Sequence, residues 1–200
     1  MERARNATFL SVDRRIIHAF LDIAHTKKVV DITVRELCTQ TFIDRTTFYR
    51  HFRGVWEILD RVIAGIEERM MRLVSAFDYD SYLRSPAEYI SANFGSLFED
   101  VETMRKAVRV DEVNSAFWSI LRKMVDCVIN SPTIPEAYRG TARLAVGASF
   151  YAEGLFFTYY AWLRGDIDCS AEELQELIIE HSMRSVIRPD AIESHNNKNE

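Results

Sequence analysis

The stretch TVRELCTQTFIDRTTFYRHF, from Thr33 to Phe52, carries the start signals of two short helices. Thr33 and Glu36 have the spacing of a capping box, in which the threonine oxygen accepts from the glutamate backbone amide while the glutamate carboxylate reaches back. Asp44 is well placed to cap a second short helix over residues 45–51. Two short helices separated by a turn of about four residues are typical of a helix-turn-helix unit. The sequence therefore predicts such a unit here.

Helical periodicity extends in both directions from this stretch, and no run alternates over the length of a strand. The predicted fold class is therefore all-α, with an N-terminal three-helix domain followed by a larger helical domain. We expect helices over residues 11–26, 33–40, 45–51, 56–77, 86–98, 102–108, 111–129, 137–163 and 171–187. The segment DYDSYLRSP, residues 78–86, is expected to interrupt them, with Pro86 opening the next helix. Domains are predicted at residues 1–55 and 56–187, with a loose tail at residues 188–200.

Charge is unevenly distributed along the 200 residues, which carry a formal net charge of −5. Residues 1–56 hold ten Lys or Arg against six Asp or Glu, whereas the remainder holds fifteen against twenty-four. A basic end on an acidic chain is a pattern in which that end could contact a polyanion while the rest stays soluble. Chance clustering of the basic residues is the alternative that charge alone leaves open.

Composition and motifs disfavour several classes of protein. A chain that is 48% hydrophobic and 28% charged suits a globular protein rather than a disordered one. The first ten residues lack the apolar segment of a secretory signal, which favours a cytoplasmic location. Cys38, Cys127 and Cys169 lack disulfide or zinc spacing, so we expect small buried thiols. With no HExxH, GxSxG or glycine-rich phosphate loop, we predict no enzyme, no metal site and no cofactor.

One apolar segment has the length of a membrane span: LAVGASFYAEGLFFTYYAWL, residues 144–163. Glu153 falls in its middle, and a carboxylate at that depth costs a few kcal/mol. We therefore predict no membrane insertion. A helix apolar on all sides must be covered on every side, so one face could line a cavity while another meets a second subunit.

A DNA-binding helix-turn-helix places the N-terminal residues of its second helix at base edges in the major groove. Arginine, threonine and tyrosine side chains suit base edges and phosphates, and residues 45–51 contain all three types. Phe48 and Phe52, four residues apart on one helical face, are expected to be core anchors instead. The candidate DNA-contacting residues are Thr33, Arg35, Arg45, Thr46, Thr47, Tyr49, Arg50 and His51.

The same stretch resembles the N-terminal DNA-binding module of the TetR/AcrR (tetracycline-repressor-type) family of bacterial transcription regulators. The resemblance is carried by Thr33, Val34, Leu37, Cys38, Ile43, Thr47, Phe48, Tyr49, His51 and Phe52. WLRGDIDCSAEELQELI, from Trp162, also resembles the close of many C-terminal domains in that family. The resemblance implies a homodimeric repressor that binds a palindromic operator and is released by a small hydrophobic effector. It further implies that the His51 imidazole faces a phosphate, that Thr33 contacts one, and that the last two long helices form the dimer interface.

Two positions depart from the family pattern. Phe42 stands where members carry a glycine in the turn, and phenylalanine fits poorly if the backbone there needs a positive φ. Val55 stands where members carry a phosphate-seeking lysine, and losing that cation weakens sequence-independent affinity. The alternative function is therefore a regulator of this fold that has lost DNA binding and acts through a protein partner.

Seven aromatic residues between Phe150 and Trp162 could form core, ligand pocket or dimer interface. The resemblance implies a ligand cavity among the helices of the second domain, and an apolar cavity with a few hydroxyls suits a hydrophobic small molecule. The candidate ligand-binding residues are Tyr151, Phe156, Tyr159 and Tyr160, with Trp118 and Met124 across from them.

Overall fold

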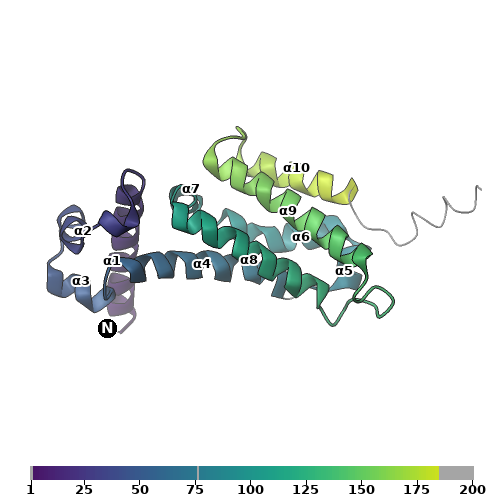
Figure 1. Ribbon diagram of the computed structural model, residues 1–200, viewed down its shortest axis with the longest axis horizontal. Coiled ribbons are helices and arrows are strands. Elements are labelled where there is room, and N and C mark those ends of the chain that lie inside the picture. Colours follow the sequence, from purple (N-terminus) through teal and green to yellow (C-terminus); the bar gives the residue numbers. More distant parts are fainter. Residues whose placement is uncertain (1, 76, 185–200) are drawn as a thin grey trace, which may run out of the picture. The chain divides into compact units, whose positions relative to one another are not determined.

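The computed structural model describes residues 2–75 and 77–184 (Figure 1). Every regular element in this part of the chain is helical, which confirms the all-α class. The α-helices are α1 (Glu2–Ala24), α2 (Val34–Thr41), α3 (Arg45–His51), α4 (Val55–Ser75), α5 (Tyr79–Arg84), α6 (Pro86–Phe94), α7 (Val101–Ala107), α8 (Asp111–Ile129), α9 (Ala142–Arg164) and α10 (Ala171–Arg184). Two short 3-10 helices, η1 (Val29–Asp31) and η2 (Gly95–Phe98), complete the set. The tail expected at residues 188–200 lies outside the described residues.

The chain divides into two compact units. The first contains the chain up to Arg69 together with Asp100–Ile120, and the second contains Met70–Glu99 and the chain from Leu121 onward. Helices α4 and α8 therefore contribute residues to both units, whereas the sequence suggested a single boundary at residue 55.

Helix α7 belongs to the first unit because it packs against α1. Polar pairs at successive turns join the two helices. The Thr103 hydroxyl lies 3.0 Å from His18 Nε2, and Lys106 Nζ lies 2.8 Å from an Asp22 carboxylate oxygen. Side chains three and four residues apart share a helix face, so these pairs form one continuous seam.

The core of the first unit is built from the apolar faces of α1 to α4. Phe48 is fully buried and Phe52 is 1% exposed, which confirms both as core anchors. They are buried together with Phe20 of α1, Leu37 of α2 and Ile58 of α4. Burial of each such side chain stabilises the fold by about 1.5–3 kcal/mol, so these apolar residues form the core of the helix-turn-helix.

Two helices differ from the expectations. Helix α1 begins at Glu2 and not at residue 11; its added turns carry Phe9, whose ring stacks on the His51 ring of α3 at 4.0 Å between centroids. Residues 79–84, expected to break the chain, form helix α5 instead. The Asp78 carboxylate caps α5 by accepting from the Ser81 backbone amide at 2.7 Å, a local start signal that the sequence interpretation missed.

Helix α9 is shorter at its start than the expected helix over residues 137–163. It begins at Ala142, where the Thr141 side chain accepts from the Leu144 amide, and it ends at Gly165 with φ of 88°. In the second unit, the buried Tyr159 hydroxyl donates to the Leu97 carbonyl, and helix α10 packs against α6. Within the described residues, none of the helices combines the length and the apolar character needed to span a membrane.

Candidate DNA-binding surface and ligand cavity

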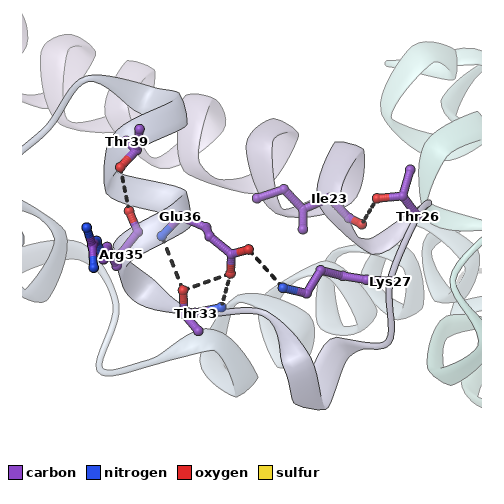
Figure 2. Close-up of polar contacts among 7 residues, drawn as sticks. All are labelled: Ile23, Thr26, Lys27, Thr33, Arg35, Glu36 and Thr39. Atoms are coloured by element: carbon purple, nitrogen blue, oxygen red, sulfur yellow. Dashed lines mark hydrogen bonds and ion pairs between the residues drawn. The ribbon is translucent and has the colours of Figure 1, made fainter.

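Helix α2 starts with the capping box that the sequence predicted (Figure 2). The Glu36 amide donates to the Thr33 hydroxyl oxygen at 3.3 Å. In return, the Thr33 amide and hydroxyl donate to the Glu36 carboxylate at 2.9 and 2.7 Å. Lys27 completes the cluster with its Nζ 2.8 Å from the other carboxylate oxygen.

These donors lower the pKa of Glu36 to about 2, with the Lys27 hydrogen bond as the largest cause and the two Thr33 hydrogen bonds next. The carboxylate is therefore an internal anion at the N-terminus of α2, where a helix favours negative charge. A phosphate that contacts Thr33 must compete with this anion for the same two donors. In Figure 2 the Arg35 guanidinium points away from the cluster.

The turn between α2 and α3 contains the Phe42 backbone in the left-handed region, with φ of 54° and ψ of 42°. The Phe42 amide donates to the Thr39 carbonyl at 3.4 Å, and the Ile43 amide donates to the Cys38 carbonyl at 3.1 Å. This pair of bonds is a Schellman motif, which usually has glycine at the left-handed position. The Phe42 side chain is 92% exposed, so packing of the ring does not offset the backbone cost.

Helix α3 starts as expected at Asp44, whose carboxylate accepts from the Thr47 amide at 2.7 Å and from the Thr47 hydroxyl at 2.9 Å. The same hydrogen bonds lower the pKa of Asp44, the backbone one most. The Thr47 hydroxyl proton is thus used within the helix cap, whereas Thr46 is exposed without such a bond.

Exposed polar side chains continue along α3. Arg45, Tyr49 and Arg50 are exposed, Tyr49 by 55%. Among the described residues, none forms a hydrogen bond or ion pair with the guanidinium groups of Arg35, Arg45 or Arg50. These groups are therefore available to an external anion.

His51 packs against α1. Its side chain is only 6% exposed, and Nδ1 lies 2.6 Å from the Asp13 carboxylate. Arg61 of α4 donates to the other oxygen of Asp13 at 2.8 Å and to the His51 carbonyl at 3.4 Å. With Phe9 stacked on the imidazole, the ring ties the end of α3 to α1 and α4. The phosphate contact of His51 therefore stays a prediction, with Nδ1 held by Asp13 and one ring face covered by Phe9.

A cavity of about 130 Å³ lies within the second unit, lined by residues of α4, α5, α6, α8 and α9 and of the segments between them. It brings together three of the predicted ligand-binding residues, Met124, Tyr151 and Phe156. The other three do not line it. Trp118 is 47% exposed and belongs to the first unit, Tyr159 is 1% exposed with its hydroxyl on Leu97, and the Tyr160 hydroxyl lies 3.4 Å from the Arg164 guanidinium.

Most of the aromatic lining of the cavity was missed by the sequence interpretation. It comes from Phe77, Tyr79, Tyr82, Tyr89 and Tyr138. The sequence predicts a helix break at residues 78–86, and two of these tyrosines lie in that segment. The available signal was Asp78, which caps α5, together with two tyrosines three residues apart in that helix, Tyr79 and Tyr82.

Comparison with solved structures finds several chains of similar fold, one of which is described here. A TetR transcriptional regulator from Streptococcus agalactiae 2603V, known from its crystal structure, is 16% identical, with 91% of this chain and 99% of that chain covered and a TM-score of 0.44. No protein-family model and no curated protein matches the chain. An identity of 16% and a TM-score of 0.44 do not establish the function of this chain.

Val55, the position where the resembled family carries a lysine, is the first residue of α4. The nearest cation before it is Arg53, whose side chain is exposed and whose amide donates to Glu57 at 2.6 Å. Arg53 is two residues earlier in the chain, so it supplies positive charge at the start of α4 without replacing a lysine in the first turn.

Proposed function

We propose that the protein is a homodimeric DNA-binding transcription regulator, a repressor released by a small ligand, and that it acts in the cytoplasm without catalytic activity. One observation carries the proposal: the guanidinium groups of Arg35, Arg45 and Arg50 are unpaired among the described residues, on a capped helix-turn-helix with a buried apolar core. Arginine forms bidentate hydrogen bonds with guanine edges and with phosphates. An exposed cluster of such groups on two adjacent short helices is suited to duplex DNA.

An exposed apolar stripe on α9 supports the dimer. Val146, Phe150 and Phe157 are 67%, 79% and 58% exposed, and their spacing of four and seven residues places them on one face. Phe150 also lines a groove together with Leu177 of α10, which is 40% exposed. Contiguous exposed apolar side chains mark interaction surfaces, and a second copy of the same two helices matches them by two-fold symmetry.

The cavity of the second unit supports the proposal that a small effector binds to this protein. If a ligand in this cavity changes the affinity for the operator, the operator must change the affinity for the ligand by the same factor. A palindromic operator follows from the dimer, because two recognition helices related by a two-fold axis read two equivalent half-sites.

The experiment that tests DNA binding is selection from a random duplex pool, followed by anisotropy titration of the selected sequence at several salt concentrations. We expect specific binding whose affinity falls steeply as salt rises. Arg45→Ala should cost about 1–3 kcal/mol and reduce the salt slope by about 1, and Tyr49→Phe should weaken binding if the hydroxyl contacts a phosphate.

Arg122→Ala is the matched control, since Arg122 is an exposed arginine of α8 in the second unit. It removes the same charge and should leave the affinity nearly unchanged. Equal losses from Arg45→Ala and Arg122→Ala would show that net charge, and not the helix-turn-helix, accounts for binding.

The dimer is tested by solution mass at micromolar concentration. Phe150→Glu should shift the mass toward the monomer because it places a charge in the apolar stripe. Trp118→Glu, which changes an exposed aromatic residue of the first unit, should not. A wild-type monomer would refute the two-fold operator arrangement.

The second candidate function is regulation through a protein partner. It is favoured by the 92% exposure of Phe42, a large apolar side chain at the turn of the helix-turn-helix, and by the absence of a cation at Val55. Failure of every duplex in the random pool to bind above background at low salt would favour this candidate.

A further inference from the structure

The cavity in the second unit has the size of a single ring. Its volume is about 130 Å³, and an apolar protein cavity of about 150 Å³ accommodates benzene. The apolar walls therefore suit one ring, and because the cavity is partly open, a polar substituent on that ring can extend from it.

The walls of the cavity are aromatic on several sides. Tyr82 is in contact with three other rings that line it, with centroid distances of 5.9 Å to Phe77, 5.9 Å to Tyr89 and 6.3 Å to Tyr151. The Phe77 and Tyr89 rings also meet edge to face at 5.9 Å. Edge-to-face arrangements of this kind extend readily to one more ring, because aromatic pairs prefer offset and T-shaped contacts.

The cavity also has one charged residue at its lining. Arg143, in the first turn of α9, is exposed to solvent and is the residue with a formal charge among the described residues that line the cavity. No described residue forms a hydrogen bond or ion pair with its guanidinium group. The nearby Arg139, by contrast, donates to the Ile134 and Pro132 carbonyls at 2.8 and 2.7 Å. The Arg139 guanidinium is thus used to hold the backbone of its own segment, whereas the Arg143 guanidinium can interact with a ligand.

We propose that this cavity binds a small carboxylate with a single aromatic ring, the ring lying among the tyrosines and the carboxylate paired with Arg143. The inference rests on the effector site of the proposed function and specifies the chemical class of its ligand. Guanidinium groups bind carboxylates through two parallel hydrogen bonds.

Other ligand classes fit less well. A cation would meet Arg143, and no carboxylate among the described lining residues would compensate for it. A neutral ring would use the aromatic walls but would gain nothing from the exposed guanidinium of Arg143. Burial raises the pKa of Tyr82 far above its usual value, so its hydroxyl stays neutral and does not repel an anion.

Three probes with the same ring and a two-carbon side chain separate these classes: phenylacetate, 2-phenylethanol and 2-phenylethylamine. Binding of each to the full-length protein is measured by isothermal titration calorimetry without DNA. We expect phenylacetate to bind at least about tenfold more tightly than the alcohol, and the amine to bind most weakly. Equal affinity for the acid and the alcohol, tighter binding of the amine, or no binding of phenylacetate at millimolar concentration would each overturn the proposal.

Two variants assign the effect to residues. Arg143→Gln should reduce phenylacetate affinity to that of 2-phenylethanol while leaving the alcohol unchanged, and Arg122→Gln, an exposed arginine that does not line the cavity, should change neither. Ala152→Leu adds three carbons at the cavity wall and should abolish binding of both probes, with circular dichroism confirming that the variant is folded. Retention of phenylacetate selectivity in Arg143→Gln would overturn the proposal.

Failure of the ligand assignment and failure of the DNA-binding function give different results. A protein that selects phenylacetate but binds no duplex keeps the ligand assignment and loses the DNA-binding function. A protein that binds a specific duplex but does not select phenylacetate keeps the function and loses the ligand assignment.

Discussion

Replacing Phe42 by glycine should stabilise the protein, although it removes a large apolar side chain. Phe42 has φ of 54° and its side chain is 92% exposed. A residue with a Cβ in the left-handed region costs about 1–2 kcal/mol, and this cost disappears with glycine. Because the ring is almost fully exposed, its removal sacrifices little hydrophobic burial.

The greater freedom of glycine in the unfolded chain opposes this gain by about 0.5–1 kcal/mol. The net effect of Phe42→Gly is therefore a stabilisation of up to about 1.5 kcal/mol, with a central value of about 0.75 kcal/mol. For a chain of this size, that free energy raises the melting temperature by about 1–4 °C.

The assay is urea unfolding followed by circular dichroism, with the shift in midpoint read at constant slope. Phe42→Ala is the first control, because it removes the ring but keeps the Cβ; it should be neutral within about 0.5 kcal/mol. Gly165→Ala is the second. Gly165 ends α9 in the same motif with φ of 88°, and an added Cβ there meets nothing within 4 Å, so the cost of about 1 kcal/mol is purely conformational.

We expect the free energy of unfolding to be higher than wild type for Phe42→Gly, close to wild type for Phe42→Ala, and lower than wild type for Gly165→Ala. A Phe42→Gly protein no more stable than Phe42→Ala would refute it. That result would mean that the ring makes a stabilising contact, or that the turn does not need a left-handed residue.

Three further predictions concern polar groups. Asp13→Asn should destabilise the protein by about 2 kcal/mol, because its single amide oxygen cannot replace both carboxylate oxygens, which His51 and Arg61 contact. The shift of the urea unfolding midpoint measures this loss. An unchanged midpoint would contradict the inward orientation of His51. Folding lowers the pKa of Glu36 from 4.5 to about 2, so the charged carboxylate stabilises the protein fully above pH 4.5 and loses this effect as the pH falls toward 2. Glu36→Gln should therefore make the stability less dependent on pH in this range. Unfolding midpoints measured between pH 5 and 2 test this. Tyr159→Phe should cost about 1–2 kcal/mol by leaving the Leu97 carbonyl without its donor and should leave phenylacetate affinity unchanged, so a loss of affinity would return Tyr159 to the cavity.

The helix-turn-helix was predictable because its signals are local. The capping pair Thr33 and Glu36 and the cap Asp44 act within three residues of themselves, and each forms the bonds that its spacing implies. Phe48 and Phe52 share a face because four residues make about one helical turn, and that face is buried whatever lies opposite it. Helix type and order followed from the same periodicity, whereas the early start of α1 and the short α5 did not, since neither has a strong apolar period.

The position of His51 was decided by contacts distant in the sequence. Its partner Asp13 is 38 residues away on α1, and the ring of Phe9 lies on an extension of that helix which periodicity did not reveal. The direction of the His51 side chain depends on which helix packs beside it, and a local motif does not contain that information.

The sequence by itself determined the all-α class, the helix-turn-helix and its start signals, since helix periodicity and capping depend on neighbours within about one turn. Only the tertiary structure decided which aromatic residues face a cavity. Tyr82, Tyr89 and Tyr151 come from three different helices, and their convergence with Arg143 depends on how those helices pack. Trp118 and Tyr159 do not line the cavity. Helical periodicity predicts on which side of its helix a residue lies, but only the packing of the helices decides what that side contacts.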